Sequence, residues 1–337
     1  MDPVESPRSI DPPRRRRMSW LIRIPLKWTI LAIVVFFVLF PNPAQFIRHL
    51  RHVSNFERMI EPNAPQFAVW EAELRDRLTK AADKSRKRNG QPAVSPPMSA
   101  DTGPTTRPGD HEWNDALSPK RVQKEVEKFT YEKVKYDWDW NVWGSADYMP
   151  TVAEMFESAG NQPDGVIRED CDGRAVMAAS LMRRLGYQSS IVTDLRHVWV
   201  TTPQGDWMGP GRKTTMRSTK AGNKVDYLST ISNVPVSLSY GVAVFPLWRE
   251  VILTLTIWLL LCRLGMGWRT FFFGGLLLFQ GLLFMRMGVL APASLRAGNE
   301  AWPAWVGLIH AVLAMGFLYW ASWRVGRRAI PLTSASA

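Results

Sequence analysis

Apolar residues in this 337-residue chain are segregated into long blocks, and this segregation constrains the fold more than any other feature. A helix that crosses a bilayer needs about 20 consecutive, mainly apolar residues. Near the N-terminus and throughout the final third of the chain, four segments approach this length: residues 24–41, 244–264, 270–289 and 302–323. The sequence therefore predicts four transmembrane helices, with a polar region between the first and the second.

Basic residues are concentrated at the ends of these apolar segments. The formal net charge is +12, which by itself would suggest nucleic-acid binding. Much of the excess lies in residues 1–23, the turn 263–269 and the tail 324–337, and basic residues are retained on the cytoplasmic side of a membrane. The sequence thus indicates a multi-pass protein of the bacterial inner membrane, with residues 42–243 on the extracytoplasmic side, the lipid bilayer as a partner and no nucleic acid.

Two features of the predicted spans argue against a cleaved signal peptide and against a transporter. After the first apolar segment, the chain lacks the small-residue pattern of a signal-peptide cleavage site, so an uncleaved anchor is favoured over a cleaved signal. Gln280 and His310 lie within later segments. Polar groups within a membrane can mark a transport path. Because the predicted spans pair no charges at mid-depth, interhelical hydrogen bonds are the favoured role of these two residues. A transporter or channel subunit therefore ranks last among the functional hypotheses.

The polar region is predicted to consist of an extracytoplasmic helix with a linker, residues 42–112, and a compact domain, residues 113–240. Within the first part, residues 64–87 carry apolar side chains at helical spacing. Residues 89–110 are rich in Pro, Gly, Ser and Thr, which is typical of a flexible linker. The second part is long enough to bury one hydrophobic core.

The compact domain has the pattern of an α+β fold. Ser118-Pro119 is a good helix start, with Ser as the N-cap and Pro at the first helical position. Residues 171–185 predict a second helix, and the glycine that follows is typical of a helix end. Residues 190–202 predict one β-strand, followed by a turn at 203–206 and a segment that pairs back with the strand.

Cys171 and His197 are the candidate catalytic pair of this domain. The chain has two cysteines, and the other one lies in an apolar block, so Cys171 is predicted to be a free thiol. A helix N-terminus favours the reactive thiolate, whereas the acidic residues beside Cys171 oppose it. His197 is the only one of five histidines in the predicted compact domain. The alternative is that Cys171 is a small core residue and His197 a hydrogen-bonded strand residue.

Several motifs surround this pair: Trp-Gly-Ser-Ala-Asp-Tyr-Met-Pro-Thr at 143–151, Glu-Met-Phe at 154–156, Glu-Asp-Cys-Asp-Gly-Arg-Ala at 169–175, Leu-Gly at 185–186, and His-Val-Trp at 197–199. Together they resemble the bacterial transglutaminase-like cysteine proteinases, and the Cys helix and His-x-Trp strand resemble the wider transglutaminase-like superfamily. The resemblance covers about residues 118–210.

The resemblance implies a papain-like, transglutaminase-like domain in which Cys171 is the nucleophile and His197 the general base and then acid. The implied chemistry is cleavage of peptide or isopeptide amides in envelope or extracellular proteins through an acyl-enzyme, or acyl transfer to an amine. Members of the proteinase group can bind calcium near the Cys-flanking acids, and Asp170 and Asp172 match those positions, although Asp170 also suits a plain N-cap. No other cofactor is expected.

The family pattern also has an Asp or Asn on the strand after the His. Residues 207–211 carry no carboxylate, so Asp206 is the nearest substitute and Asp226 a more distant one. Asp206 equally suits a β-turn position. A Cys–His pair without its third member holds the imidazole less well. The alternative function is therefore a catalytically degenerate domain that serves as an envelope protein-binding module.

Overall fold

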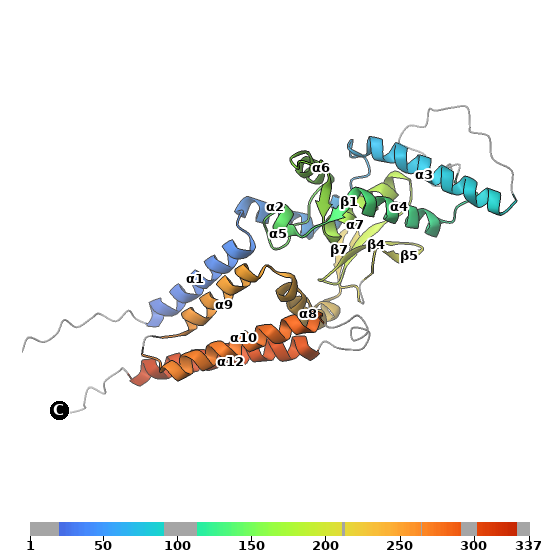
Figure 1. Ribbon diagram of the computed structural model, residues 1–337. Helices are drawn as coiled ribbons and strands as arrows, with labels where there is room; N and C mark the ends of the chain where they lie inside the picture. The colour runs from blue at the N-terminus through green and yellow to red at the C-terminus, as the bar shows by residue number, and fades with distance from the viewer. Residues whose placement is uncertain (1–19, 91–112, 211–212, 264, 291–301, 329–337) are drawn as a thin grey trace, which may run out of the picture.

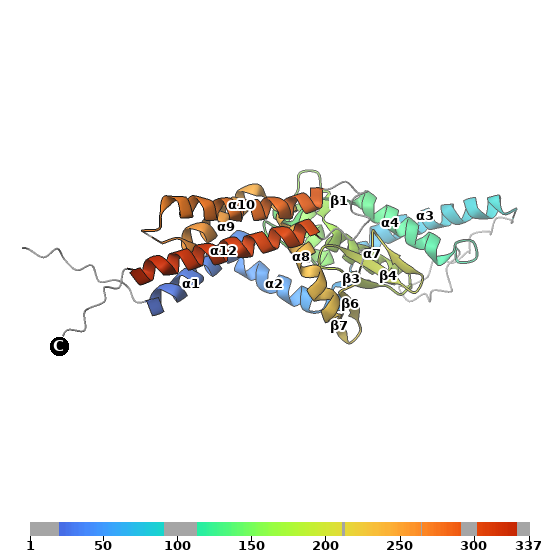
Figure 2. The ribbon, with the colours of Figure 1, turned by 90° about the horizontal axis from the view of Figure 1, so that it is seen from below.

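The computed structural model describes residues 20–90, 113–210, 213–263, 265–290 and 302–328. It consists of a mixed helical and sheet lobe connected to a group of long apolar helices (Figures 1 and 2). Most of the predicted linker, and much of both predicted basic tails, lie outside the described residues.

Among the described residues, three helices are long and apolar enough to cross a membrane, and a fourth span exists only if one bent pair counts as a span. This finding indicates a membrane protein and agrees with three of the predicted spans. The long helices are α1 (Trp20–Leu39), α10 (Trp268–Leu290) and α12 (Trp302–Arg328).

The predicted span at 244–264 differs from the structure. Helix α8 (Tyr227–Val244) meets α9 (Leu247–Leu261) at an angle of 118°. Pro246 disfavours helical backbone at the residue before it, and Phe245 accordingly adopts extended angles of φ −66° and ψ 146°. At 1.5 Å per residue, the 15 residues of α9 are about 22 Å long, shorter than the bilayer core.

The helices of the lobe cover both the predicted compact domain and the segment before it. The predicted helix at 64–87 is present, as is the one that begins after Ser118, whereas the first helix after α1 was not predicted. The helices are α2 (Pro43–Ser54), the short 3₁₀ helix η1 (Phe56–Met59), α3 (Phe67–Arg88), α4 (Pro119–Lys133), α5 (Asp139–Val142), α6 (Val152–Gly160) and α7 (Cys171–Arg184).

The strands form a two-stranded parallel pair, β1–β2, and a five-stranded antiparallel sheet of order β5-β4-β3-β6-β7. Their bounds are β1 (Val134–Tyr136), β2 (Ile167–Glu169), β3 (Ser190–Thr193), β4 (Val198–Thr202), β5 (Gly205–Trp207), β6 (Met216–Thr219) and β7 (Gly222–Val225).

The segment predicted as one strand at 190–202 is two antiparallel strands, β3 and β4. The chain turns between them because Asp194 Oδ1 accepts hydrogen bonds from the backbone N–H groups of Arg196 and His197. Leu195 lies in the left-handed region with φ 71°. This turn places His197 immediately before β4, where it lines the same cleft as Cys171.

One hydrophobic core joins α3, α4, α7 and the five-stranded sheet. Leu74 and Leu78 of α3 are fully buried in the same cluster as Phe129 of α4 and Trp199 of β4. The compact unit therefore begins well before the predicted boundary at residue 113. The predicted end of the compact domain at Tyr240 lies inside α8, which runs to Val244.

Candidate functional site

A cleft of about 340 Å³ lies where the first turn of α7, the start of β4, the 143–149 loop and the end of α8 meet. Both Cys171 and His197 line it. Another hollow, of about 440 Å³, lies over residues 61–66, but no thiol or imidazole lines that hollow. The predicted nucleophile and base are thus brought to one cleft by elements that are distant in the sequence.

Cys171 is the first residue of α7, as the sequence predicts. Asp170 caps the helix by accepting a hydrogen bond from the backbone N–H of Asp172, with 3.1 Å between N and O. Burial raises the pKa of the Cys171 thiol well above its ordinary value, and the charge of Asp170 raises it further, while the backbone N–H of Val198 lowers it. Burial and the neighbouring negative charge therefore oppose formation of the reactive thiolate.

The His197 imidazole is held by backbone atoms. Its Nε2 lies 3.0 Å from the carbonyl oxygen of Met208, and its ring stacks beside that of Trp199 with centroids 6.1 Å apart. When Nε2–H donates to this carbonyl, Nδ1 is left as the unprotonated acceptor. In this tautomer Nδ1, the ring nitrogen that faces away from Met208, can accept a proton as a general base must.

The structure does not bring Asp206 to this pair. Asp206 is exposed on β5, paired across the strands with Thr201, and is not among the residues that line the cleft. The carbonyl of Met208, and not a carboxylate, contacts the His197 imidazole. A backbone carbonyl leaves no residue-type signal, and the left-handed turn that presents it (Met208 φ 66°, Gly209 φ 70°) can be seen only in the structure.

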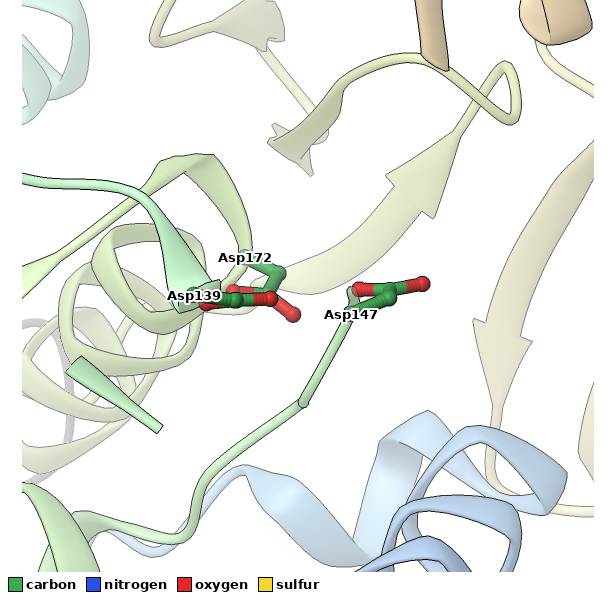
Figure 3. A group of neighbouring side chains, drawn as sticks. All are labelled: Asp139, Asp147 and Asp172. Carbon is green, nitrogen blue, oxygen red and sulfur yellow. The ribbon is translucent and has the colours of Figure 1, made fainter. Parts of the chain in front are cut away.

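Three carboxylates form an acidic cluster against the cleft: those of Asp139, Asp147 and Asp172 (Figure 3). One oxygen atom from each lies within 4.8 Å of the others. Asp139 is only 2% exposed. Its Oδ2 accepts a hydrogen bond from the backbone N–H of Tyr148 at 2.6 Å, but no donor contacts its Oδ1 within the described part of the chain.

The cluster carries unfavourable charge when its members are ionised. Burial, followed by the nearby carboxylates, raises the pKa values of Asp139 and Asp172 well above their ordinary range. A hard divalent cation such as Ca²⁺ prefers carboxylate and carbonyl oxygens. The donor set and the unpartnered Oδ1 of Asp139 therefore fit such a cation, with other ligands required to complete its shell.

Of the two residues predicted to bind calcium, the structure places only Asp172 in this cluster, and Asp170 acts as the N-cap of α7. Asp139 and Asp147 were not predicted as ligands. Asp147 belongs to the motif at 143–151 that carries the family resemblance, which was an available signal. Asp139 lies between tryptophans and has no spacing that points to a metal site.

Helices at the membrane end of the lobe hold the 143–149 loop that carries Asp147. The Ala146 N–H donates to the Leu39 carbonyl of α1 at 2.7 Å, and Arg249 of α9 donates to the Gly144 carbonyl at 2.9 Å. From α2, the Gln45 amide donates to the Trp143 carbonyl at 3.2 Å. One wall of the cleft is therefore held by hydrogen bonds to α1, α2 and α9.

No family model matches the chain, and neither does any curated protein or solved structure to which it was compared. The resemblance of the motifs around Cys171 and His197 to the transglutaminase-like proteinases stays a prediction. The structure itself shows the cleft, its thiol and imidazole, and the acidic cluster.

Proposed function

We propose that this protein is a membrane-anchored, transglutaminase-like cysteine hydrolase that acts on peptide or isopeptide amides of envelope proteins. The observation that carries the proposal is the convergence of Cys171 and His197 in one cleft, with Nε2 of the imidazole held by the Met208 carbonyl. A thiol becomes a nucleophile when a neighbouring base takes its proton. The oriented imidazole is that base.

The reaction proceeds in two steps. The thiol proton passes to Nδ1 of His197 as the sulfur bonds to the substrate carbonyl carbon, and the C–N bond breaks as the leaving amine takes this proton from the imidazolium. Water then gives a proton to His197 while its oxygen attacks the thioester, and the thiol is regenerated as the acid leaves. An amine in place of water gives acyl transfer.

Asp139, Asp147 and Asp172 would hold a divalent cation, with calcium the leading candidate, and it would supply positive charge near the thiol. The charges of Asp147 and Asp139 would then no longer raise the pKa of Cys171, whereas burial and the charge of Asp170 still would. We expect the protein to work in the bacterial inner membrane with residues 42–243 on the extracytoplasmic side, a placement supported by the basic residues that flank its apolar segments.

A binding module without catalysis is the second candidate, and the raised pKa of the Cys171 thiol favours it. The two are separated by Cys171→Ala and Cys171→Ser in the full chain, with the envelope proteome of producing cells compared by mass spectrometry. The hydrolase loses its cleavage products in both variants while the protein remains folded. A binding module retains its cellular effect in both, which would overturn the proposal.

A further inference from the structure

Helix α8 has no charged residue and a strongly exposed apolar face. The chain carries no Asp, Glu, Lys or Arg from Tyr227 to Trp248. The exposed side chains recur at helical spacing, so they form one stripe along the helix. They are Tyr227 (75% exposed), Leu228 (81%), Ile231 (69%), Val234 (41%) and Leu238 (47%).

This helix crosses the ends of the membrane helices instead of extending them. It meets α9 at 118°. Its last turns pack on α10, where Arg286 donates to the carbonyls of Val242 at 3.1 Å and Phe245 at 2.9 Å. Figures 1 and 2 show α8 at the end of α10 and α12 that faces the lobe. Contiguous exposed apolar patches mark sites of contact with a membrane or a protein, and this stripe lies beside helices that are apolar enough to cross a bilayer.

The neighbouring face of the same helix forms a wall of the thiol cleft. Ser237, Tyr240, Gly241 and Val244 line the cleft together with Cys171, and their spacing places them on one face of α8 beside the exposed stripe. One helix therefore presents an exposed apolar stripe on one side and a wall of the cleft on the adjacent side. Val244 lies three positions before Leu247, the first residue of α9.

Aromatic side chains gather where this wall of the cleft meets the α8–α9 bend. Trp138 and Trp140 line the cleft and stack with centroids 4.7 Å apart and ring planes 12° apart. Trp138 also contacts Tyr240, and Trp140 contacts Phe245 at the α8–α9 bend. Trp and Tyr gather at membrane–water interfaces because their rings suit both environments. Side chains of the kind found at that interface therefore line the cleft beside α8.

We propose that the cleft receives its substrate from the bilayer surface, and that this substrate is the juxtamembrane segment of a second protein anchored in the same membrane. This inference rests on the proposed function and names its substrate class. Confinement to one membrane raises the effective concentration of such a segment at the thiol. The carboxylates of Asp147, Asp170 and Asp172 also line the cleft. Of these, the Asp147 side chain is 66% exposed, and its carboxylate repels a phospholipid phosphate and attracts the basic residues that flank spans, which favours a protein over a lipid.

Access to the thiol tests the proposal without requiring turnover. The full chain with Cys262→Ser is placed in nanodiscs of phosphatidylethanolamine and phosphatidylglycerol, and Cys171 labelling is followed by peptide mass spectrometry. The probes are a single-span peptide with a maleimide immediately outside its apolar segment, phosphatidylethanolamine with a headgroup maleimide, and soluble N-ethylmaleimide. A reference thiol is introduced by Lys84→Cys, on the exposed surface of α3, in a chain that also carries Cys171→Ala and Cys262→Ser.

We expect the ratio of spanning-peptide to soluble labelling to be at least about tenfold higher for Cys171 than for the reference thiol. Leu228→Lys with Ile231→Lys lowers this ratio toward that of the reference, because two charges displace α8 from the apolar boundary. Val69→Lys, which changes a 75% exposed side chain on α3, leaves the ratio unchanged. Unchanged labelling by N-ethylmaleimide shows that the variants retain their fold.

Equal ratios for Cys171 and the reference thiol would overturn the proposal. Faster labelling by the lipid probe than by the spanning peptide would overturn the substrate class in favour of a lipid. Both results leave the proposed chemistry standing, since labelling measures access alone. Conversely, an alkylation rate of Cys171 that does not depend on His197 would exclude the proposed hydrolase. The proposal that the cleft lies at the membrane interface would then still stand.

Discussion

Nε2 of His197 lies 3.0 Å from the carbonyl oxygen of Met208, so the imidazole is oriented by the backbone of a left-handed turn. A carbonyl fixes one tautomer, as a carboxylate would, but it supplies no negative charge to stabilise the imidazolium. The pair therefore depends on the shape of the turn between β5 and the residues that follow it.

Gly209→Val is expected to disturb this turn and the imidazole together. Gly209 has φ 70°, and a Cβ atom there would lie 3.3 Å from Nε2 of His197. The strained backbone costs about 1 kcal/mol, and the added methyl groups displace the ring. Cys171 alkylation should lose its dependence on His197. Gly205→Val is the matched control, since Gly205 also has a positive φ but nothing within 4 Å. Equal effects of the two variants would contradict this role for Met208.

Asp206→Asn is expected to change neither the Cys171 alkylation profile nor the free energy of unfolding by more than about 0.5 kcal/mol. The side chain is exposed on β5 and paired opposite Thr201. The comparison is with His197→Ala in the same assay. If Asp206→Asn changed the Cys171 alkylation profile as much as His197→Ala does, Asp206 would have to reach the imidazole during the reaction.

Glu169→Gln is expected to stabilise the lobe at neutral pH by about 1 kcal/mol or more. Glu169 is fully buried, and burial followed by the charge of Asp170 raises its pKa well above the ordinary value. A raised folded-state pKa favours the protonated form, so its contribution to stability is complete below the unfolded pKa and is lost as pH rises through the folded one. Thermal unfolding from pH 4 to pH 8 should show a smaller loss in Glu169→Gln. The exposed Glu157→Gln serves as control, and an identical slope in both would refute the assignment.

Calcium should raise the melting temperature of the full chain, and Asp139→Asn should remove this effect. A ligand at about 100 times its Kd stabilises the folded state by about 2.7 kcal/mol. Without calcium, Asp139→Asn should itself be stabilising at neutral pH, because it removes a carboxylate whose pKa burial raises. Thermal scans in calcium and in chelator check both statements. A calcium response that survives Asp139→Asn would place the cation elsewhere.

Leu78→Ala should cost about 2–5 kcal/mol of unfolding free energy, because Leu78 of α3 is fully buried in the shared core. The control is Val69→Ala on the exposed face of the same helix. A fragment that begins at residue 113 should accordingly fail to fold. A small effect of Leu78→Ala would mean that the stability of the lobe does not depend on α3. The compact domain could then begin at residue 113, as predicted.

The sequence predicts the elements whose cause is local and periodic. Helix α7 begins at Cys171 under its Asp170 N-cap and ends before Gly186, whose φ of 80° suits a helix stop. The break between β3 and β4 was missed because the Asp194 side chain turns the backbone inside an otherwise strand-like run. The α8–α9 bend was missed because apolar character continues through Pro246.

The candidate site was only partly predictable for a similar reason. Cys171 and His197 have residue types that indicate chemistry, and the structure brings both to one cleft. Asp139 and the Met208 carbonyl depend on tertiary approach, which no spacing in the sequence reports. The contribution of α8 to the cleft depends on the bend that periodicity alone does not reveal.

The most direct test of the central claim is the alkylation rate of Cys171 against pH, in the full chain with Cys262→Ser, in calcium and in chelator, with and without His197→Ala. We expect the apparent pKa of the Cys171 thiol to be lower in calcium than in chelator, and to rise when His197 is removed. A thiol pKa that stays raised in every condition and changes with neither His197 nor calcium would contradict the hydrolase and leave a binding domain on a membrane anchor.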